Sequence, residues 1–322
     1  MKLLDKTGKP RTGIITIGIP KAMMFYEHGR LWEDFFRGLG CGVVTSGGTN
    51  RKILNDGVGC SSNENCLPVK VLTGHVMELI NRSDYIFIPR YTTTGKLEFT
   101  CPKFCGLPDM MRMNFGSKAR IIELDIDYND GLAKTEESLK KLAPLLGIDY
   151  ERIHSSFLST VKNHIGFEME TAEELEPDYA VRPSIALLGH PYVIQDTFIN
   201  MDLRDKLHSR GYNVLSPANL DQDVKRQNVY PQQNFFYGVG YDILGSAFTY
   251  AQDPNVRGLI YISTFSCGVD SILTEYIERH LKTIAPIPYL KITIDEQTGE
   301  AGFDTRLEAF LDMIGEAPKK AV

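Results

Sequence analysis

Short apolar runs alternate with amphipathic segments along this chain. Residues 14–17 and 185–188 are unbroken runs of apolar or β-branched residues, each with the length of a buried strand. After each run comes a segment in which apolar residues recur every three or four positions, residues 31–39 in one case and 198–207 in the other. This spacing is typical of a helix with one buried face, so the pattern predicts two copies of a strand followed by a helix.

Each predicted helix ends at a glycine, Gly40 or Gly211, and a second apolar strand follows directly. Glycine is common at helix ends because it adopts the left-handed conformation that closes them. Strand, helix and strand in this order form a βαβ unit, which requires parallel strands. The later strands that we expect are residues 85–88, 121–124, 259–262 and 289–292.

These elements predict an α/β protein made of two tandem Rossmann-like, doubly wound parallel-sheet domains with a helical connection. We expect residues 1–170 to form the N-terminal domain and residues 171–322 the C-terminal domain. The boundary should lie in the acidic stretch 168–178, after a helical segment at about 135–165. Residues 230–234 have the composition of a functional or interface loop.

The composition excludes several classes of function. The chain has 322 residues and is 43% hydrophobic, which suffices for two domains with their own cores. Its net charge of −6, without any basic tract, argues against nucleic-acid binding. We find neither a secretory signal nor an apolar run long enough to span a membrane, and therefore expect a cytoplasmic protein. Disulfides are rare in that compartment, so the six cysteines need another explanation.

Three cysteines are placed to reach the carboxyl ends of parallel strands, where open sheets bind their ligands. Cys66 precedes a predicted helix, Cys101 follows strand 85–88, and Cys267 follows strand 259–262. Thiolates are ligands of zinc and of iron–sulfur clusters, and a helix N-terminus beside Cys66 or Cys267 favours the thiolate form. We therefore predict one [4Fe–4S] cluster on these three cysteines in the cleft between the domains, with one iron left open.

The remaining cysteines leave alternatives open. Any single cysteine is commonly just a small buried apolar residue, and Cys41, which opens a strand, fits that interpretation. Cys60 and Cys105 are further candidate metal ligands. Together with Cys66 and Cys101 they could form a four-thiolate zinc site, although their spacing is not the usual Cys-x-x-Cys. That alternative corresponds to a zinc-stabilised small-molecule-binding protein.

Polar residues near these cysteines are candidates for proton transfer. Glu64 lies two residues before Cys66, His190 follows a strand end, and Ser266 precedes Cys267. We predict catalytic roles for all three, and the alternative for Glu64 is an acid that favours the start of a helix.

Two further residues have a structural alternative. His75 is expected to be a packed, hydrogen-bonded histidine more often than a proton donor. Arg90 either binds an anion such as a CoA phosphate or forms an ion pair with Glu123 or Asp125.

Segments spread over nearly the whole chain resemble the acyl-CoA dehydratase activase-related family. They are Gly18-Ile19-Pro20-Lys21-Ala22, Glu64-x-Cys66-x-Pro68-x-Lys70, Gly74-His75, Phe87-Ile88-Pro89-Arg90, Cys101-Pro102, Phe265-Ser266-Cys267-Gly268-x-Asp270-Ser271, and the stretch from Asp295 to Phe310. This family is related to the 2-hydroxyacyl-CoA dehydratase superfamily, which includes 2-hydroxyglutaryl-CoA dehydratase.

The resemblance implies a [4Fe–4S] cluster on three cysteines that receives low-potential electrons from an ATP-dependent activase. It leaves an acyl-CoA or another small molecule as the substrate. Because symmetric oligomers are common, we expect a homodimer, with a complex of related subunits as the alternative. Related double-cubane [8Fe–9S] proteins reduce small molecules and need six cysteines, and a non-catalytic scaffold for cluster assembly is a further alternative. Because the chain has no Gly-x-x-x-x-Gly-Lys segment, we expect the activase to be a separate protein.

Overall fold

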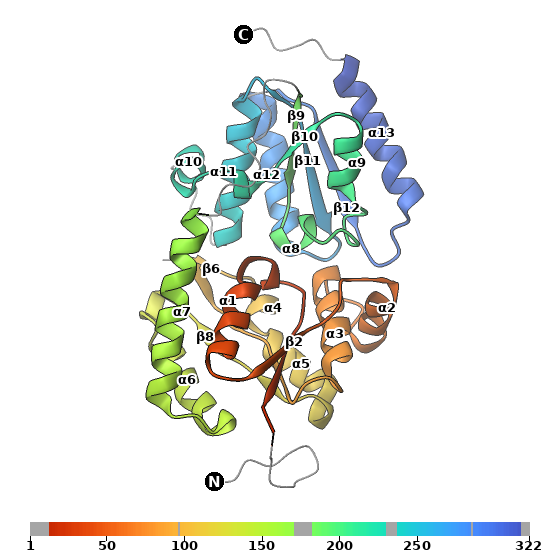
Figure 1. Ribbon diagram of the computed structural model, residues 1–322. Coiled ribbons are helices and arrows are strands. Elements are labelled where there is room, and N and C mark those ends of the chain that lie inside the picture. The colour runs from red at the N-terminus through yellow and green to blue at the C-terminus, as the bar shows by residue number, and fades with distance from the viewer. Residues whose placement is uncertain (1–12, 96, 171–181, 230–236, 285, 317–322) are drawn as a thin grey trace. The chain divides into compact units, whose positions relative to one another are not determined.

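The fold is seen in a computed structural model that describes residues 13–95, 97–170, 182–229, 237–284 and 286–316 (Figure 1). The chain forms two compact units, Met1–Thr171 and Ala172–Val322. Both are mixed α/β structures with parallel sheets. The predicted loop 230–234 and most of the predicted boundary stretch, residues 171–178, lie outside the described residues. Among the helices that are described, none is both long and apolar enough to span a membrane.

The first unit contains a four-stranded sheet in which every neighbouring pair is parallel. In spatial order its strands are β2 (Gly42–Thr45), β1 (Thr16–Ile19), β3 (Tyr85–Phe87) and β7 (Ile121–Ile122). Beyond β3 and β7 the chain pairs again as β4 (Arg90–Tyr91) with β8 (Asp125–Ile126), also in parallel. An antiparallel pair, β5 (Thr93–Gly95) with β6 (Glu98–Phe99), completes the strands described in this unit.

Helices connect these strands and cover the sheet. They are α1 (Phe25–Gly38), α2 (Arg51–Cys60), α3 (Leu67–Leu79), α4 (Pro102–Cys105), α5 (Leu107–Phe115), α6 (Ala133–Leu146) and α7 (Tyr150–Glu170), with short 3₁₀ turns at Gly116–Lys118 and Tyr128–Asp130. Figure 1 shows α1 beside α7, and α2 beside α3. The helical segment expected at 135–165 is two helices, because Gly147 adopts a left-handed conformation with φ of +65° and ends α6.

The second unit contains another fully parallel four-stranded sheet. In spatial order its strands are β10 (Asn213–Leu215), β9 (Ser184–Leu188), β11 (Val256–Thr264) and β12 (Tyr289–Ile294). The helices are α8 (Pro191–Ile194), α9 (Leu203–Ser209), α10 (Gln222–Asn228), α11 (Gly238–Gln252), α12 (Gly268–Ile284) and α13 (Glu300–Glu316), with a 3₁₀ turn at Pro217–Asn219. Figure 1 shows α11 and α12 on one side of the sheet, and α9 and α13 on the other.

The two predicted helix-ending glycines adopt the same conformation. Gly40 and Gly211 both have φ of +83°. In each case the next residue donates its N–H five residues back, from Cys41 to Phe36 at 3.0 Å and from Tyr212 to Leu207 at 3.2 Å. This closure leads the chain directly from the helix into the neighbouring parallel strand, so the helix-ending glycines and the strands after them are confirmed.

The second copy of the repeat has a shorter helix than its apolar spacing predicts. The Asp196 carboxylate caps a single turn by accepting the N–H groups of Phe198 and Ile199, both at 3.1 Å. Met201 and Asp202 then adopt left-handed conformations, and α9 begins only at Leu203. The prediction of a helix starting at residue 198 was therefore wrong.

Helices α2 and α3 contact each other backbone to backbone. A methyl group at Gly57 would lie 1.9 Å from the Lys70 carbonyl oxygen, and one at Gly74 would lie 1.9 Å from the Ile53 carbonyl oxygen. Only glycine permits this approach, because any Cβ would overlap the facing backbone. The contact fixes the start of α3 and therefore the position of Cys66, which immediately precedes that helix.

Replacing Gly57 with alanine should destabilise the first unit by about 3 kcal/mol, because the new methyl group forces α2 and α3 apart. Gly59 on the same helix is the matched control, since a methyl group there would meet no atom within 4 Å. Gly59→Ala should be neutral or stabilise by up to about 1 kcal/mol through helix propensity. Urea unfolding followed by circular dichroism measures both, and equal stability of the two variants would contradict the close contact.

Candidate functional site

Each of the three predicted cluster ligands lies at the start of a helix. Cys66 precedes α3 with φ −66° and ψ 155°, and Cys101 precedes α4 with φ −68° and ψ 153°. Cys267 immediately precedes α12, and its carbonyl accepts the N–H of Ser271 at 3.2 Å. All three thiols are half-buried and none is in a disulfide. Thiols in this position face the positive end of the helix dipole, which stabilises a thiolate.

The segments that carry Cys66 and Cys101 are joined to each other. The Lys103 ammonium, in the first turn after Cys101, donates to the Glu64 carbonyl oxygen at 2.8 Å. Glu64 lies two residues before Cys66 and its side chain is exposed. The hydrogen bond thus brings a positive charge and both cysteine segments into one region of the first unit.

Burial raises the pKa of the Cys101 thiol, while the backbone N–H groups of Phe104 and Lys103 act in the opposite direction. Because burial is the larger effect, the free thiol keeps its proton at neutral pH. A bound metal would reverse this, since metal binding to cysteine releases the thiol proton.

Cys60 and Cys105 have other neighbours in this structure. Cys60 is exposed at the end of α2, with its sulfur 3.9 Å from that of Met77. The sulfur of Cys105 lies 3.6 Å from the Thr92 hydroxyl. The alternatives in which these two cysteines hold a metal stay predictions. Cys41 is buried in the core, as expected.

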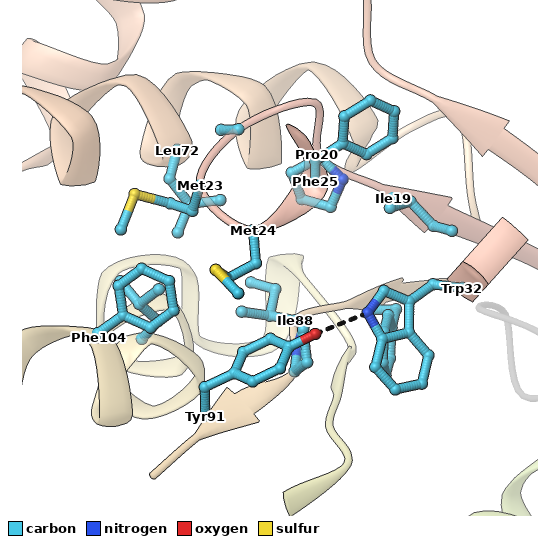
Figure 2. Close-up of a pocket in the computed structure, with 14 residues that line it drawn as sticks. Ile19, Pro20, Met23, Met24, Phe25, Trp32, Leu72, Ile88, Tyr91 and Phe104 are labelled. Atoms are coloured by element: carbon cyan, nitrogen blue, oxygen red, sulfur yellow. Dashed lines mark hydrogen bonds between the residues drawn. The ribbon is translucent and has the colours of Figure 1, made fainter. Parts of the chain in front are cut away.

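An apolar pocket lies where β1 and β3 end, in the first unit (Figure 2). Its walls include Leu72 of α3 and Phe104 of α4, the two helices that begin after Cys66 and Cys101. The cavity volume is about 30 Å³, enough for water and small beside the pockets that usually enclose a substrate.

A buried tyrosine closes one side of this pocket. Figure 2 shows the Tyr91 hydroxyl facing Trp32, whose indole N–H donates to it at 3.0 Å. The same hydroxyl is 2.7 Å from Nδ1 of His28. Burial and then the charge of His164 lower the pKa of His28 to about 4, so its ring is neutral at pH 7. The Tyr91 hydroxyl therefore accepts from Trp32 and shares a second hydrogen bond with the neutral ring of His28.

His75 joins three segments at the edge of the first sheet. Its Nδ1 is 2.8 Å from the Ser46 hydroxyl and its Nε2 is 3.0 Å from the Thr49 hydroxyl. The Ser46 hydroxyl also accepts the N–H of Lys21 at 2.7 Å. His75 is fully buried, and burial followed by the charge of Lys21 lowers its pKa from 6.5 to about 4. The expectation of a packed, hydrogen-bonded histidine is confirmed.

Arg90 is part of an ion-pair network. Its guanidinium lies 2.8 Å from the Asp109 carboxylate, 2.9 Å from Glu123 and 3.1 Å from Asp125. It also donates to the Cys105 carbonyl at 2.8 Å. Three carboxylates neutralise this cation, which confirms the ion-pair interpretation and leaves the guanidinium poorly suited to a CoA phosphate.

The second unit brings three potential metal ligands of different types together. His190, Cys267 and Asp270 place one ligand atom each within 4.8 Å of one another, and they form the one such group within the part of the chain that the structure describes. Nε2 of His190 is 3.7 Å from the Cys267 sulfur and 3.4 Å from an Asp270 carboxylate oxygen. His190 and Asp270 are buried, whereas Cys267 is partly exposed.

The backbone places His190 beside Cys267. Strands β9 and β11 pair in parallel with Leu188 opposite Tyr261, so both chains leave the sheet at the same edge. Gly189 then turns with φ of +144°, where a Cβ would lie 2.7 Å from the Ile262 carbonyl oxygen. No other residue fits at this position without moving the strand, and the turn directs His190 toward Cys267.

Asp270 was not predicted as a site residue, although it lies in the segment 265–271 that resembles the activase-related family. Its carboxylate accepts the Tyr261 hydroxyl at 2.7 Å and the Thr264 N–H at 2.9 Å, and its own N–H donates to the Cys267 sulfur at 3.4 Å. The available signal was its spacing, because a residue three positions after Cys267 lies on the same side of the first helical turn. Ser266, with φ of +65°, makes the turn before Cys267 and is exposed, and its catalytic role stays a prediction.

A family model described as the CoA enzyme activase uncharacterised domain (DUF2229) matches residues 16–220. The chain belongs to this family. The match supports the expected activase-related family, and it spans the first unit from β1 onward and reaches the 3₁₀ turn at Pro217–Asn219 of the second. The relation to the 2-hydroxyacyl-CoA dehydratase superfamily stays a prediction.

Solved structures show only distant likeness. The SBP FpvC from P. aeruginosa in complex with Ni²⁺ is 12% identical with a TM-score of 0.30, over 96% of this chain and 100% of that chain. The dinucleotide-forming acetyl-coenzyme A synthetase 1 of Ca. Korarchaeum cryptofilum, in its apo form, is 13% identical with a TM-score of 0.19, over 94% of this chain and 61% of that chain. These scores are too low to support any conclusion, and no curated protein matches the chain.

Lowering the pH from 6.5 to 4 should destabilise the first unit through His75. The buried ring stays neutral down to its lowered pKa of about 4, whereas the unfolded chain takes up a proton below 6.5. The free energy of unfolding is therefore highest above pH 6.5 and falls by about 3 kcal/mol across this window. His28, with a pKa also lowered to about 4, acts in the same direction.

Urea unfolding at a series of pH values measures this dependence. His75→Gln should be less stable at pH 7 but show a flatter slope between pH 6.5 and 4, because glutamine does not titrate. His208→Gln, which changes an exposed histidine, should keep the wild-type slope. A wild-type slope in His75→Gln would contradict the assignment of this pH dependence to His75.

Proposed function

We propose that this protein is an iron–sulfur redox protein that receives electrons from an ATP-dependent activase of a CoA enzyme. Membership of the activase-related family supports an activase as the partner protein. The paired geometry of Cys66 and Cys101 supports the cluster and is the observation that carries the proposal. Both thiols precede helices with nearly the same backbone angles, and Lys103 hydrogen-bonds the two segments together.

The donor set fits an iron–sulfur cluster. Cys66 and Cys101 both lie at the start of a helix, and neither is in a disulfide. The N-terminus of α3 beside Cys66, and the Lys103 charge with the backbone N–H groups beside Cys101, favour the anionic ligands of such a cluster. When bound, the cluster would supply a one-electron carrier.

Cys267 is the third thiolate of the proposed set, and the second unit supplies it. Three cysteines leave one iron for another ligand, such as an oxygen of an acyl-CoA. The [8Fe–9S] alternative is less well supported, because it needs six cysteines and Cys41 is buried in the core of the first unit.

We also propose that both units are Rossmann-like, so that the chain is a tandem repeat. Each unit has a four-stranded parallel sheet with helices between its strands, and the matching closures at Gly40 and Gly211 support a common origin of the two. In this proposal Glu64 and the Lys103 segment form part of the surface on which the separate activase docks, because electron transfer requires a short path to the cluster.

Iron and acid-labile sulfide after anaerobic purification, with EPR of the reduced protein, test the proposal. We expect about four irons per chain and the signal of a reducible cubane. Cys66→Ala, Cys101→Ala and Cys267→Ala should each lose or degrade the cluster, since each removes one ligand. Cys41→Ala is the control and should keep the iron.

Several outcomes would change the assignment. Full iron and an unchanged spectrum in Cys101→Ala would show that the ligand assignment is wrong. About eight irons per chain would favour the double-cubane alternative instead. A wild-type protein without iron would remove the redox function, and this result does not depend on the folding of any variant.

A further inference from the structure

The spacing of His190, Cys267 and Asp270 fits a single tetrahedral metal ion. An ion about 2.3 Å from a sulfur and about 2.0–2.1 Å from a nitrogen or oxygen separates sulfur from nitrogen by about 3.6 Å and nitrogen from oxygen by about 3.4 Å. Nε2 of His190 lies 3.7 Å from the Cys267 sulfur and 3.4 Å from the Asp270 carboxylate. Two of the three separations therefore already match those around one shared ion, and the third, from the Cys267 sulfur to the Asp270 carboxylate, is within 4.8 Å.

Hydrogen bonding alone explains this arrangement less well. Nε2 of His190 faces both the thiol and the carboxylate, and a single N–H proton serves only one acceptor well. A nucleophilic triad needs the two ring nitrogens on different partners, one toward the nucleophile and one toward the carboxylate. Around one metal ion, in contrast, a nitrogen, a sulfur and an oxygen all lie close to one another, because each of them faces the same ion.

The surroundings hold these ligands in place. The Tyr261 hydroxyl and the Thr264 N–H fix the Asp270 carboxylate, at 2.7 Å and 2.9 Å, and still leave lone pairs on its oxygens. The Tyr192 ring stacks on the imidazole of His190 with 4.9 Å between ring centroids. Partners of this kind orient metal ligands in known sites, and their loss weakens metal binding.

We infer that the second unit binds one divalent transition-metal ion of the zinc type through His190 Nε2, Cys267 Sγ and an Asp270 carboxylate oxygen. Three protein ligands leave a fourth position for water or a small ligand, and the partly exposed Cys267 gives access to it. This site goes beyond the proposed function. Each iron of a cubane takes one protein ligand, so a cluster and this ion compete for the Cys267 thiolate.

Cobalt binding to the full-length, untagged Cys66→Ser/Cys101→Ser protein tests the site without the thiols of the proposed cluster pair. Co²⁺ replaces Zn²⁺ and reports on its ligands by absorption. We expect a thiolate-to-cobalt charge-transfer band, strong visible bands of four-coordinate cobalt, one Co²⁺ per chain, and displacement of the cobalt by Zn²⁺.

Variants in the same background identify the ligands. Cys267→Ser should abolish the charge-transfer band, and His190→Gln and Asp270→Asn should each weaken Co²⁺ binding by more than about tenfold. Tyr261→Phe keeps the ring but removes the hydroxyl that orients Asp270, so it should weaken binding by about tenfold and keep the charge-transfer band. Cys60→Ser, which removes an exposed thiol of the first unit, is the matched control and should change nothing.

Absence of four-coordinate cobalt in the Cys66→Ser/Cys101→Ser protein, or an unchanged charge-transfer band after Cys267→Ser, would overturn the inference. If Cys267→Ser does not fold, unchanged affinity in both His190→Gln and Asp270→Asn would overturn it equally. The iron content of the wild-type protein tests the proposed cluster separately, so failure of one proposal is distinguishable from failure of the other.

Discussion

Parallel pairing between buried strands positions the metal-ligand group of the second unit. Strand β9 lies between β10 and β11 and runs parallel to both, so the segments that follow β9 and β11 leave the sheet at the same edge. That constraint places His190 beside Cys267 although they are far apart in the sequence. The contact is tight, because Gly189 lies directly against the carbonyl of Ile262. The pairing of two backbones therefore positions the group before any side chain contributes.

The first unit uses the same constraint with an added polar link. The segments after β1 and β2 emerge at one sheet edge, and His75 of α3 joins them through the Ser46 hydroxyl. Gly57 and Gly74 set how closely α2 and α3 approach. This contact fixes the position of α3, and with it the positions of His75 and Cys66. A neutral imidazole suits this link because each of its nitrogens finds a hydroxyl partner. The same burial that favours the neutral ring makes the fold less stable at acid pH, because the unfolded chain takes up the proton more readily.

The sequence predicted those features whose causes are local. Residues 185–188 form an unbroken apolar run because β9 is buried on both faces, and Gly211 marks a helix end because only a left-handed residue closes it. Local reasoning failed after Asp196, where the left-handed conformations of Met201 and Asp202 interrupt the apolar pattern and delay α9 to Leu203. It also failed at Asp270. Its spacing from Cys267 was the one local signal, and the approach of His190 across the sheet, which makes the residue a candidate ligand, is not visible in the sequence.

The cysteines of the two units have different surroundings. Cys66 and Cys101 stand at helix starts, and Lys103 joins their two segments; in our proposal each supplies one thiolate to an iron of the cluster. Cys267 is surrounded by a nitrogen and an oxygen ligand, a mixed set that suits zinc better than a sulfur-rich cluster. Both proposed sites use the Cys267 thiolate, so the ligands around it decide whether the cluster or the single ion binds. In our proposal His190 and Asp270 favour the single ion, so a cluster would bind Cys267 only in place of that ion.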